Sequence, residues 1–135
     1  MLERQFLDPM QSYTSTAGSW APYYASGGGW MLLNTTSALN DEVSMTVGLA
    51  AGTYKLDVEY MHDSECCEGT FYLDGAEIGK INQYEAAVEN KVGYVHTFTD
   101  IVVAEAGKHT LAVKVTAKGA ASAEYFVIGY MSFHE

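Results

Sequence analysis

The sequence predicts an all-β fold, a sandwich of two sheets made of about eight antiparallel strands. Apolar and polar residues alternate over residues 54–60, as in a strand with one buried and one solvated face. A second glycine-led strand of the same pattern follows at 107–113, with Gly107 in the place of Gly52. These two matched strands, together with the lack of any long helical periodicity, indicate two facing layers.

Length and charge limit the kinds of protein this chain can be. Its 135 residues fit one domain, residues 1–135, in which residues 1–10 are a candidate N-terminal arm. Hydrophobic residues make up 48% and charged residues 18% of the chain, which favours a globular core over disorder. The net charge of -10 repels phosphates and anionic lipids, so nucleic acid is not an expected partner. Membrane insertion is not expected either, because no apolar run approaches the roughly 20 residues of a membrane helix.

Short apolar or alternating segments between turn residues predict the other strands. They lie at residues 30–33, 43–47, 70–73, 76–79, 94–103 and 125–133. Asp74-Gly75 predicts a tight hairpin turn between two of them. The glycines at 27–29 predict either a flexible loop or a close approach of the backbone to another segment. Residues 80–93 fit either one helical turn or a long loop.

The last predicted strand, residues 125–133, is apolar on both faces, so its second face needs a cover. That cover is either a loop of the same chain or a second subunit. Together with the apolar residues near the N-terminus, the strand supplies a candidate interface. Its members are Phe6, Leu7, Met10, Tyr125, Val127 and Met131.

Four segments together carry a family resemblance. They are Gly-Thr-Tyr-Lys-Leu-Asp-Val-Glu-Tyr at 52–60, Tyr-Leu-Asp-Gly-Ala-Glu-Ile-Gly at 72–79, Ala-Gly-Lys-His-Thr-Leu-Ala-Val-Lys-Val at 106–115 and Tyr-Phe-Val-Ile-Gly-Tyr-Met at 125–131. In this order they resemble the galactose-binding-like jelly-roll domains, which include many carbohydrate-binding modules and accessory domains of glycosidases. The resemblance extends over residues 41–133 and implies a jelly-roll sandwich.

The chain departs from the pattern of sugar-binding relatives at two places. Such relatives often have Asp or Asn in the closing strand, where this chain has Ile128-Gly129-Tyr130. They also often have Asp-Leu-Tyr where this chain has Asn82-Gln83-Tyr84. Both departures argue against an inherited sugar or calcium site. We therefore expect no cofactor, and a structural calcium ion has no support in the sequence.

Aromatic residues in and beside the glycine-rich segment form a candidate glycan-binding site. Sugar CH groups stack on aromatic faces, and nearby polar groups can hold the hydroxyls. The candidate residues are Trp20, Tyr23, Tyr24, Trp30 and Asn34. The alternative interpretation is that these aromatics plug the end of the sandwich or a seam between subunits.

The densest polar cluster lies at 62–68 and contains His62, Asp63, Glu65 and Glu68. Carboxylates with a histidine can bind a cation, but this spacing matches no known metal-binding loop, so we expect a solvated loop without metal. The adjacent Cys66 and Cys67 are expected to be free thiols, because neighbouring side chains on a strand point in opposite directions.

The sequence gives no sign of catalysis. It contains no nucleophile-elbow or phosphate-loop motif, so we expect no catalytic residue and no enzyme. His109 takes the core position of Tyr54 in the second glycine-led strand, so a buried, hydrogen-bonded histidine is expected there.

The main functional hypothesis is a non-enzymatic protein on the surface of a particle, such as a tailed-phage capsid decoration (cement) protein or a head or tail appendage. It depends on a small domain without a catalytic partner, an N-terminus unlike a signal peptide, and free cysteines that fit a reducing compartment. Such a protein would be made in the host cytoplasm and lie on the virion surface. It would form a homo-oligomer, for example a trimer, that contacts a major capsid or other virion protein.

The alternative hypothesis is a carbohydrate-binding module that recognises a glycan, such as one on a cell surface, with its loop aromatics. Such a module would be secreted or attached to the cell surface if a leader had been removed.

Overall fold

A computed structural model describes residues 4–135 and confirms the all-β prediction. Twelve strands account for the regular structure of this range, and all pairings between strands are antiparallel. Residues 1–3 of the predicted N-terminal arm lie outside the described range. Residues 4–135 contain no helix that is long and apolar enough to cross a membrane.

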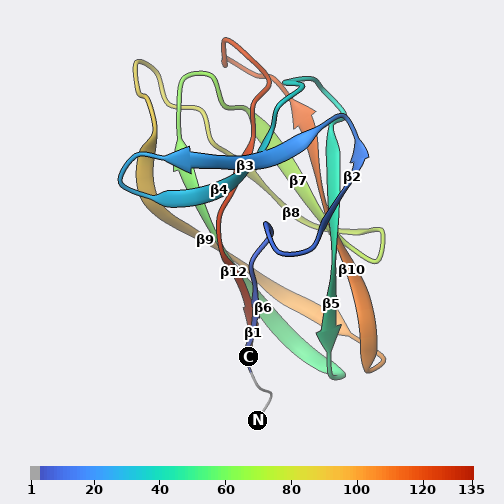
Figure 1. Cartoon of the computed structure of the whole chain (residues 1–135). Helices are drawn as coiled ribbons and strands as arrows, with labels where there is room; N and C mark the ends of the chain where they lie inside the picture. Colours follow the sequence, from blue (N-terminus) through green and yellow to red (C-terminus); the bar gives the residue numbers. More distant parts are fainter. Residues whose placement is uncertain (1–3) are drawn as a thin grey trace.

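Two sheets form the sandwich (Figure 1). The first has four strands in the order β1 (Gln5–Leu7), β12 (Met131–His134), β6 (Gly52–His62) and β9 (Lys91–Val103). The second has five strands in the order β2 (Tyr13–Ala17), β5 (Glu42–Leu49), β10 (Gly107–Ala117), β7 (Glu68–Leu73) and β8 (Ala76–Asn82). The two glycine-led strands, β6 and β10, therefore lie in different sheets, as the sequence predicts.

A third, smaller sheet has the order β11 (Val127–Ile128), β4 (Gly29–Asn34) and β3 (Trp20–Ala25). In Figure 1, β3 and β4 form a hairpin that crosses the front of the molecule at a steep angle to the sandwich strands. The single strand predicted at 125–133 is therefore two strands, which belong to different sheets. The chain changes sheets at Gly129, whose N–H donates to the Glu59 carbonyl of β6 at 2.8 Å.

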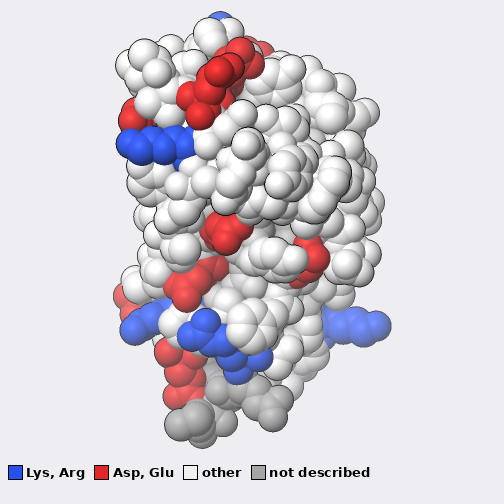
Figure 2. Space-filling view, turned by 60° about the vertical axis from the view of Figure 1, so that its left-hand side comes forward, with Lys and Arg blue, Asp and Glu red and all other residues white. Residues whose placement is uncertain are grey.

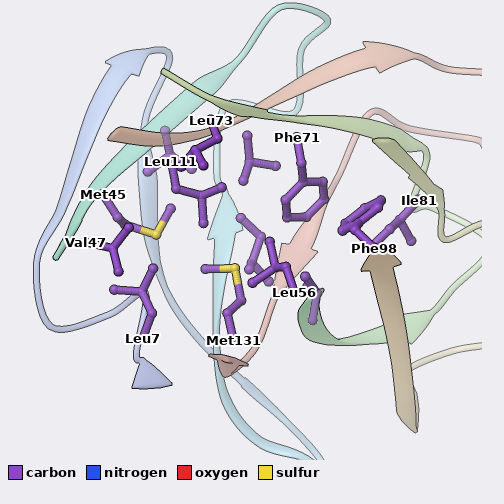
Figure 3. Packing of buried hydrophobic residues seen from close by; sticks show 14 of the residues in the cluster. Leu7, Met45, Val47, Leu56, Phe71, Leu73, Ile81, Phe98, Leu111 and Met131 are labelled. Carbon is purple, nitrogen blue, oxygen red and sulfur yellow. The ribbon is translucent and has the colours of Figure 1, made fainter. Parts of the chain in front are cut away.

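The main core lies between the two large sheets and follows the predicted alternation. Tyr54 and Leu56 of β6 face Leu111 and Val113 of β10, and all four side chains are buried. Figure 3 shows Leu56 and Leu111 pointing into this layer together with the ring of Phe71. Each such side chain contributes about 1.5–3 kcal/mol when it leaves water. The inward direction of Tyr54 and Leu56 confirms the predicted register.

Most of the candidate interface is covered by the chain itself. Leu7, Val127 and Met131 are buried, and Val127 packs against Met31 of β4. Of the two predicted alternatives for these three residues, the structure therefore shows cover by the same chain, and they are not available as an exposed interface. Phe6 is 74% exposed. Met10 and Tyr125 are half-buried.

The predicted turn at Asp74-Gly75 joins β7 to β8, and both residues have positive φ values, 50° and 84°. The Asp74 carboxylate accepts the Thr110 N–H at 2.8 Å and lies 2.6 Å from His109 Nδ1. His109 Nε2 lies 2.9 Å from the carbonyl oxygen of Glu105. His109 is thus hydrogen-bonded, as predicted, but it is half-buried, with 13% of its side chain exposed, and does not belong to the core cluster.

The contact between these two side chains predicts a pH dependence of stability. The hydrogen bond between the His109 ring and the Asp74 carboxylate raises the pKa of His109 and lowers the pKa of Asp74. The histidine therefore stabilises the fold fully below its unfolded pKa of about 6.5, and this contribution is lost as the pH rises through the folded value. The aspartate contributes above about pH 4, and its contribution is lost as the pH falls.

We expect the melting temperature of the wild type to fall more than that of His109→Gln between about pH 6 and pH 9. Thermal unfolding followed by circular dichroism in one buffer series measures the difference. Equal slopes for the two proteins would contradict the proposed linkage.

Candidate functional site

The β3–β4 hairpin is the element around which the candidate site is built. Its strands pair from Trp20 with Asn34 to Ala25 with Gly29. A side chain at Gly28 would approach Val92 of β9 to 2.5 Å, so the glycine-rich segment is a place of close backbone approach. The absence of a side chain at this position allows the hairpin to pack on the outer side of β9.

A pocket of about 230 Å³ lies under this hairpin. It is lined by Tyr23, Leu33, Met61, Asp63, Glu65, Cys66, Asn90 and Tyr125. The hairpin supplies two of these residues, and the others come from the end of β6, the loop after it, the residue before β9 and the residues before β11. Segments far apart in the sequence therefore meet at one end of the sandwich, where binding sites commonly form between loops.

Hydrogen bonds fix the polar wall of the pocket. The carboxylate of Asp63 is buried and accepts two backbone N–H groups, from Glu65 at 2.8 Å and from Asn90 at 3.0 Å. The Tyr23 hydroxyl donates to Asn90 Oδ1 at 2.8 Å. Asn90 has a positive φ of 46°, a conformation that asparagine tolerates better than most residues. The ring of Tyr23 and the loop at Asp63 are thus held in a defined geometry.

Cys66 lies in this wall and Cys67 follows it in the chain. Both thiols are free, as predicted, and both are buried. Burial raises the pKa of Cys66, and the nearby carboxylates of Asp63 and Glu65 raise it further. Burial also raises the pKa of Cys67 to about 12, with an added contribution from Glu124. Both thiols are therefore neutral at physiological pH, and neither is a candidate nucleophile.

Tyr24 and Trp30 form an exposed aromatic pair on the hairpin. They lie opposite each other across β3 and β4 and are 58% and 55% exposed. Their ring centroids are 5.5 Å apart in an edge-to-face arrangement. Neighbouring side chains on a strand point to opposite faces, so this pair lies on the other side of the hairpin from Tyr23 and the pocket.

Charge is unevenly distributed around the hairpin tip and the beginning of β9, which lie on the left in Figure 1 and come forward in Figure 2. Figure 2 shows basic side chains at the upper left and in the lower part of this face, and separate acidic side chains at its top, near its middle and at its bottom.

The structure divides the predicted aromatic site. Tyr23 lines the pocket, and Tyr24 and Trp30 lie on the other face of the hairpin. Trp20 is only 5% exposed and belongs to the main core, so the expectation that it contacts a ligand is wrong. For this residue the alternative interpretation, a plug at the end of the sandwich, describes what is seen.

Asn34 is fully buried and holds the protein together rather than a ligand. Its Nδ2 donates to Asp41 Oδ2 at 3.0 Å and to the Glu124 carbonyl at 2.7 Å. Its Oδ1 accepts the Phe126 N–H at 2.6 Å. All polar atoms of the amide are therefore engaged within the chain, which corrects its assignment to the glycan site.

Four pocket residues were not among the predicted site residues: Leu33, Met61, Cys66 and Asn90. The sequence places Asp63 and Glu65 in its densest polar cluster and predicts a solvated loop there, whereas in the structure both residues line the pocket. Tyr125 was assigned to an interface. In the described range 4–135, no group of three or more His, Cys, Asp or Glu side chains is arranged to hold a metal ion.

Comparison with known proteins supports the fold. No family model and no curated protein matches this sequence. A family 36 carbohydrate-binding module of a multidomain xylanase from the hindgut metagenome of Trinervitermes trinervoides is a similar solved structure, with a TM-score of 0.72 and 17% identity. The alignment covers 98% of each chain.

Two further structures have the same fold. A family 36 module in complex with calcium and xylotriose has a TM-score of 0.70 and 17% identity, over 96% of this chain and 99% of the other. A family 35 module from Clostridium thermocellum has a TM-score of 0.66 and 15% identity, over 97% and 98%. The chain therefore has the galactose-binding-like jelly-roll fold of these modules.

The role of Asn34 predicts a large loss of stability on its removal. Asn34→Ala removes the side-chain partner of the buried Phe126 N–H and the hydrogen bonds to Asp41 and to the Glu124 carbonyl, and we expect the free energy of unfolding to fall by about 2–4 kcal/mol. Urea unfolding followed by tryptophan fluorescence measures this loss. Thr35→Ala, on the exposed neighbouring residue, is the control and should change stability by less than about 1 kcal/mol. Similar losses for both variants would contradict the structural role of Asn34.

Proposed function

We propose that this chain is a non-enzymatic glycan-binding module whose pocket under the β3–β4 hairpin holds one sugar unit. The observation that carries the proposal is the composition of the pocket: two tyrosines, Tyr23 and Tyr125, with Asp63, Glu65 and Asn90. Aromatic side chains with a few convergent polar groups are what a sugar needs, because its CH faces are apolar and its hydroxyls donate and accept hydrogen bonds. The volume of about 230 Å³ lies below that of pockets for drug-sized ligands, which suits a single ring.

The fold supports this proposal because the similar structures named above are carbohydrate-binding modules. None of them supports a phage capsid decoration protein, so the alternative hypothesis from the sequence becomes the main one. The homo-oligomer, the capsid partner and the virion location stay predictions.

A binding role fits the pocket better than catalysis. The carboxylate of Asp63 is committed to two backbone N–H groups, so its place in the fold is to shape the loop. The thiol of Cys66 is held neutral by burial. What remains free to contact a ligand is a set of hydrogen-bonding groups and ring faces, which bind without forming or breaking a bond.

Two neighbouring residues provide a sharp test, because Tyr23 and Tyr24 lie on opposite faces of β3. Tyr23→Ala removes a ring from the pocket, and we expect it to weaken glycan binding about tenfold or more, as the loss of one stacked aromatic would. Tyr24→Ala, the matched control, should bind like the wild type. A glycan array that contains xylan, mannan and galactan oligosaccharides identifies the ligand, and titration calorimetry then measures the affinities.

Melting temperatures of both variants exclude unfolding as the cause of a loss. If Tyr24→Ala or Trp30→Ala abolishes binding while Tyr23→Ala does not, the ligand lies on the outer face of the hairpin and the pocket is the wrong site. If the wild type binds no glycan on the array, the proposed function is wrong.

A further inference from the structure

The pocket contains acidic groups without a basic partner. Of its eight lining residues in the described chain, Asp63 and Glu65 are carboxylates and none is Lys, Arg or His. Lys91 follows the pocket residue Asn90, but its Nζ lies 3.1 Å from Glu85 Oε2, so its charge is paired. A ligand in this pocket therefore meets two negative charges that no side chain in its wall neutralises.

The thiol of Cys66 lines the same pocket and lies close to both carboxylates. Its pKa is raised first by burial and then by repulsion between a thiolate and the carboxylates of Asp63 and Glu65. Negative charge in the wall of the pocket is thus disfavoured at the position of a residue that lines it. A ligand that brings an anion to the same place would meet the same repulsion.

The carboxylates of Asp63 and Glu65 differ in their burial and in their hydrogen bonds. Asp63 is 8% exposed, and each of its oxygens accepts one backbone N–H, so it is fixed as part of the wall. Glu65 is exposed, and its carboxylate accepts no hydrogen bond from residues 4–135. It is therefore the acidic group that can turn toward a bound sugar.

We propose that the pocket selects its sugar by charge: an amino sugar with a free ammonium group binds best, a neutral sugar binds less tightly, and a uronate is rejected, with Glu65 as the specificity-determining residue. This inference rests on the proposed function, since it concerns the ligand of the same pocket.

Physical chemistry gives this order of affinity. An ammonium near Glu65 forms a partly exposed ion pair, and the faces of Tyr23 and Tyr125 attract a cation as well. A neutral hydroxyl keeps the stacking and hydrogen bonds but lacks the charge term. A uronate adds repulsion from both carboxylates, and the net charge of -10 acts in the same direction over a longer distance at low salt.

Three trisaccharides that share one backbone test the order: the β-1,4-linked trimers of glucose, glucosamine and glucuronic acid. We expect the glucosamine trimer to bind about three- to tenfold more tightly than the glucose trimer at about 20 mM salt, and the glucuronate trimer to bind more weakly than both. At about 300 mM salt the preference should shrink, because the ion pair is exposed and screened. Titration calorimetry with the wild-type chain measures all six affinities.

Glu65→Gln keeps the shape and the hydrogen-bonding capacity of the side chain and removes its charge. It should abolish most of the preference for the glucosamine trimer, so that the ratio of the affinities for the glucosamine and glucose trimers falls toward one. Glu77→Gln is the matched control. Glu77 is exposed on β8. It lines a second groove, together with Val103 of β9, and this groove shares no residue with the pocket under the hairpin. This control should leave all three affinities unchanged.

The outcomes separate the inference from the proposed function. If the glucose trimer binds and the glucuronate trimer binds equally well or better, or if Glu65→Gln leaves the order unchanged, the inference is wrong and glycan binding stands. If the glucosamine trimer does not bind at all, the inference is wrong as well, and the glycan array alone decides whether the proposed function survives.

Discussion

Two buried amide side chains hold the backbone on which the rest of this end of the molecule depends. Gln83 binds Val127 on both sides, with Nε2 donating to its carbonyl at 2.6 Å and Oε1 accepting its N–H at 3.0 Å. Asn34 accepts the N–H of the preceding residue, Phe126. Such bonds are strong in a dry interior, where an unpaired polar group costs about 1–3 kcal/mol. They fix the position of β11, and β11 pairs with β4, so the hairpin and the pocket beneath it follow from them.

The same arrangement gives the pocket its chemistry. The backbone of Tyr125 donates to the Glu65 carbonyl at 3.3 Å and accepts the Cys67 N–H at 2.9 Å, so the acidic loop is tied to the residues just before β11. Asp63 then ties that loop to Asn90. One side of the pocket is thus acidic because its carboxylates belong to the loop after β6. That loop is held in place by its hydrogen bonds to the backbone of Tyr125 and Asn90. The other side is aromatic because the hairpin turns Tyr23 inward and leaves Tyr24 outside.

Much of the fold could be predicted from the sequence, because it depends on local alternation. The inward residues of β6 and β10 and the turn at Asp74-Gly75 all follow from patterns within a few residues. The site could not be predicted in the same way. The alternation of side chains along a strand places Tyr23 and Tyr24 on opposite faces of the hairpin, but it does not say which face is covered. The rest of the chain decides this, because Met61 and Asn90, which lie beside Tyr23, are far from it in the sequence. The apolar run at 125–133 looks like one strand because a change of sheet at a glycine leaves no mark in hydrophobicity.

The hydrogen bonds between Gln83 and Val127 give a physical explanation for one departure from the pattern of sugar-binding relatives, at Asn82-Gln83-Tyr84. A glutamine in place of an apolar side chain in the core destabilises a protein unless its amide is fully bonded. Gln83 is fully buried, and both ends of its amide are bonded to Val127. The buried amide of Gln83 is therefore fully bonded within the chain, and Gln83 does not line the pocket. For this reason the departure that argued against a sugar site at the level of sequence carries no weight against the pocket under the hairpin.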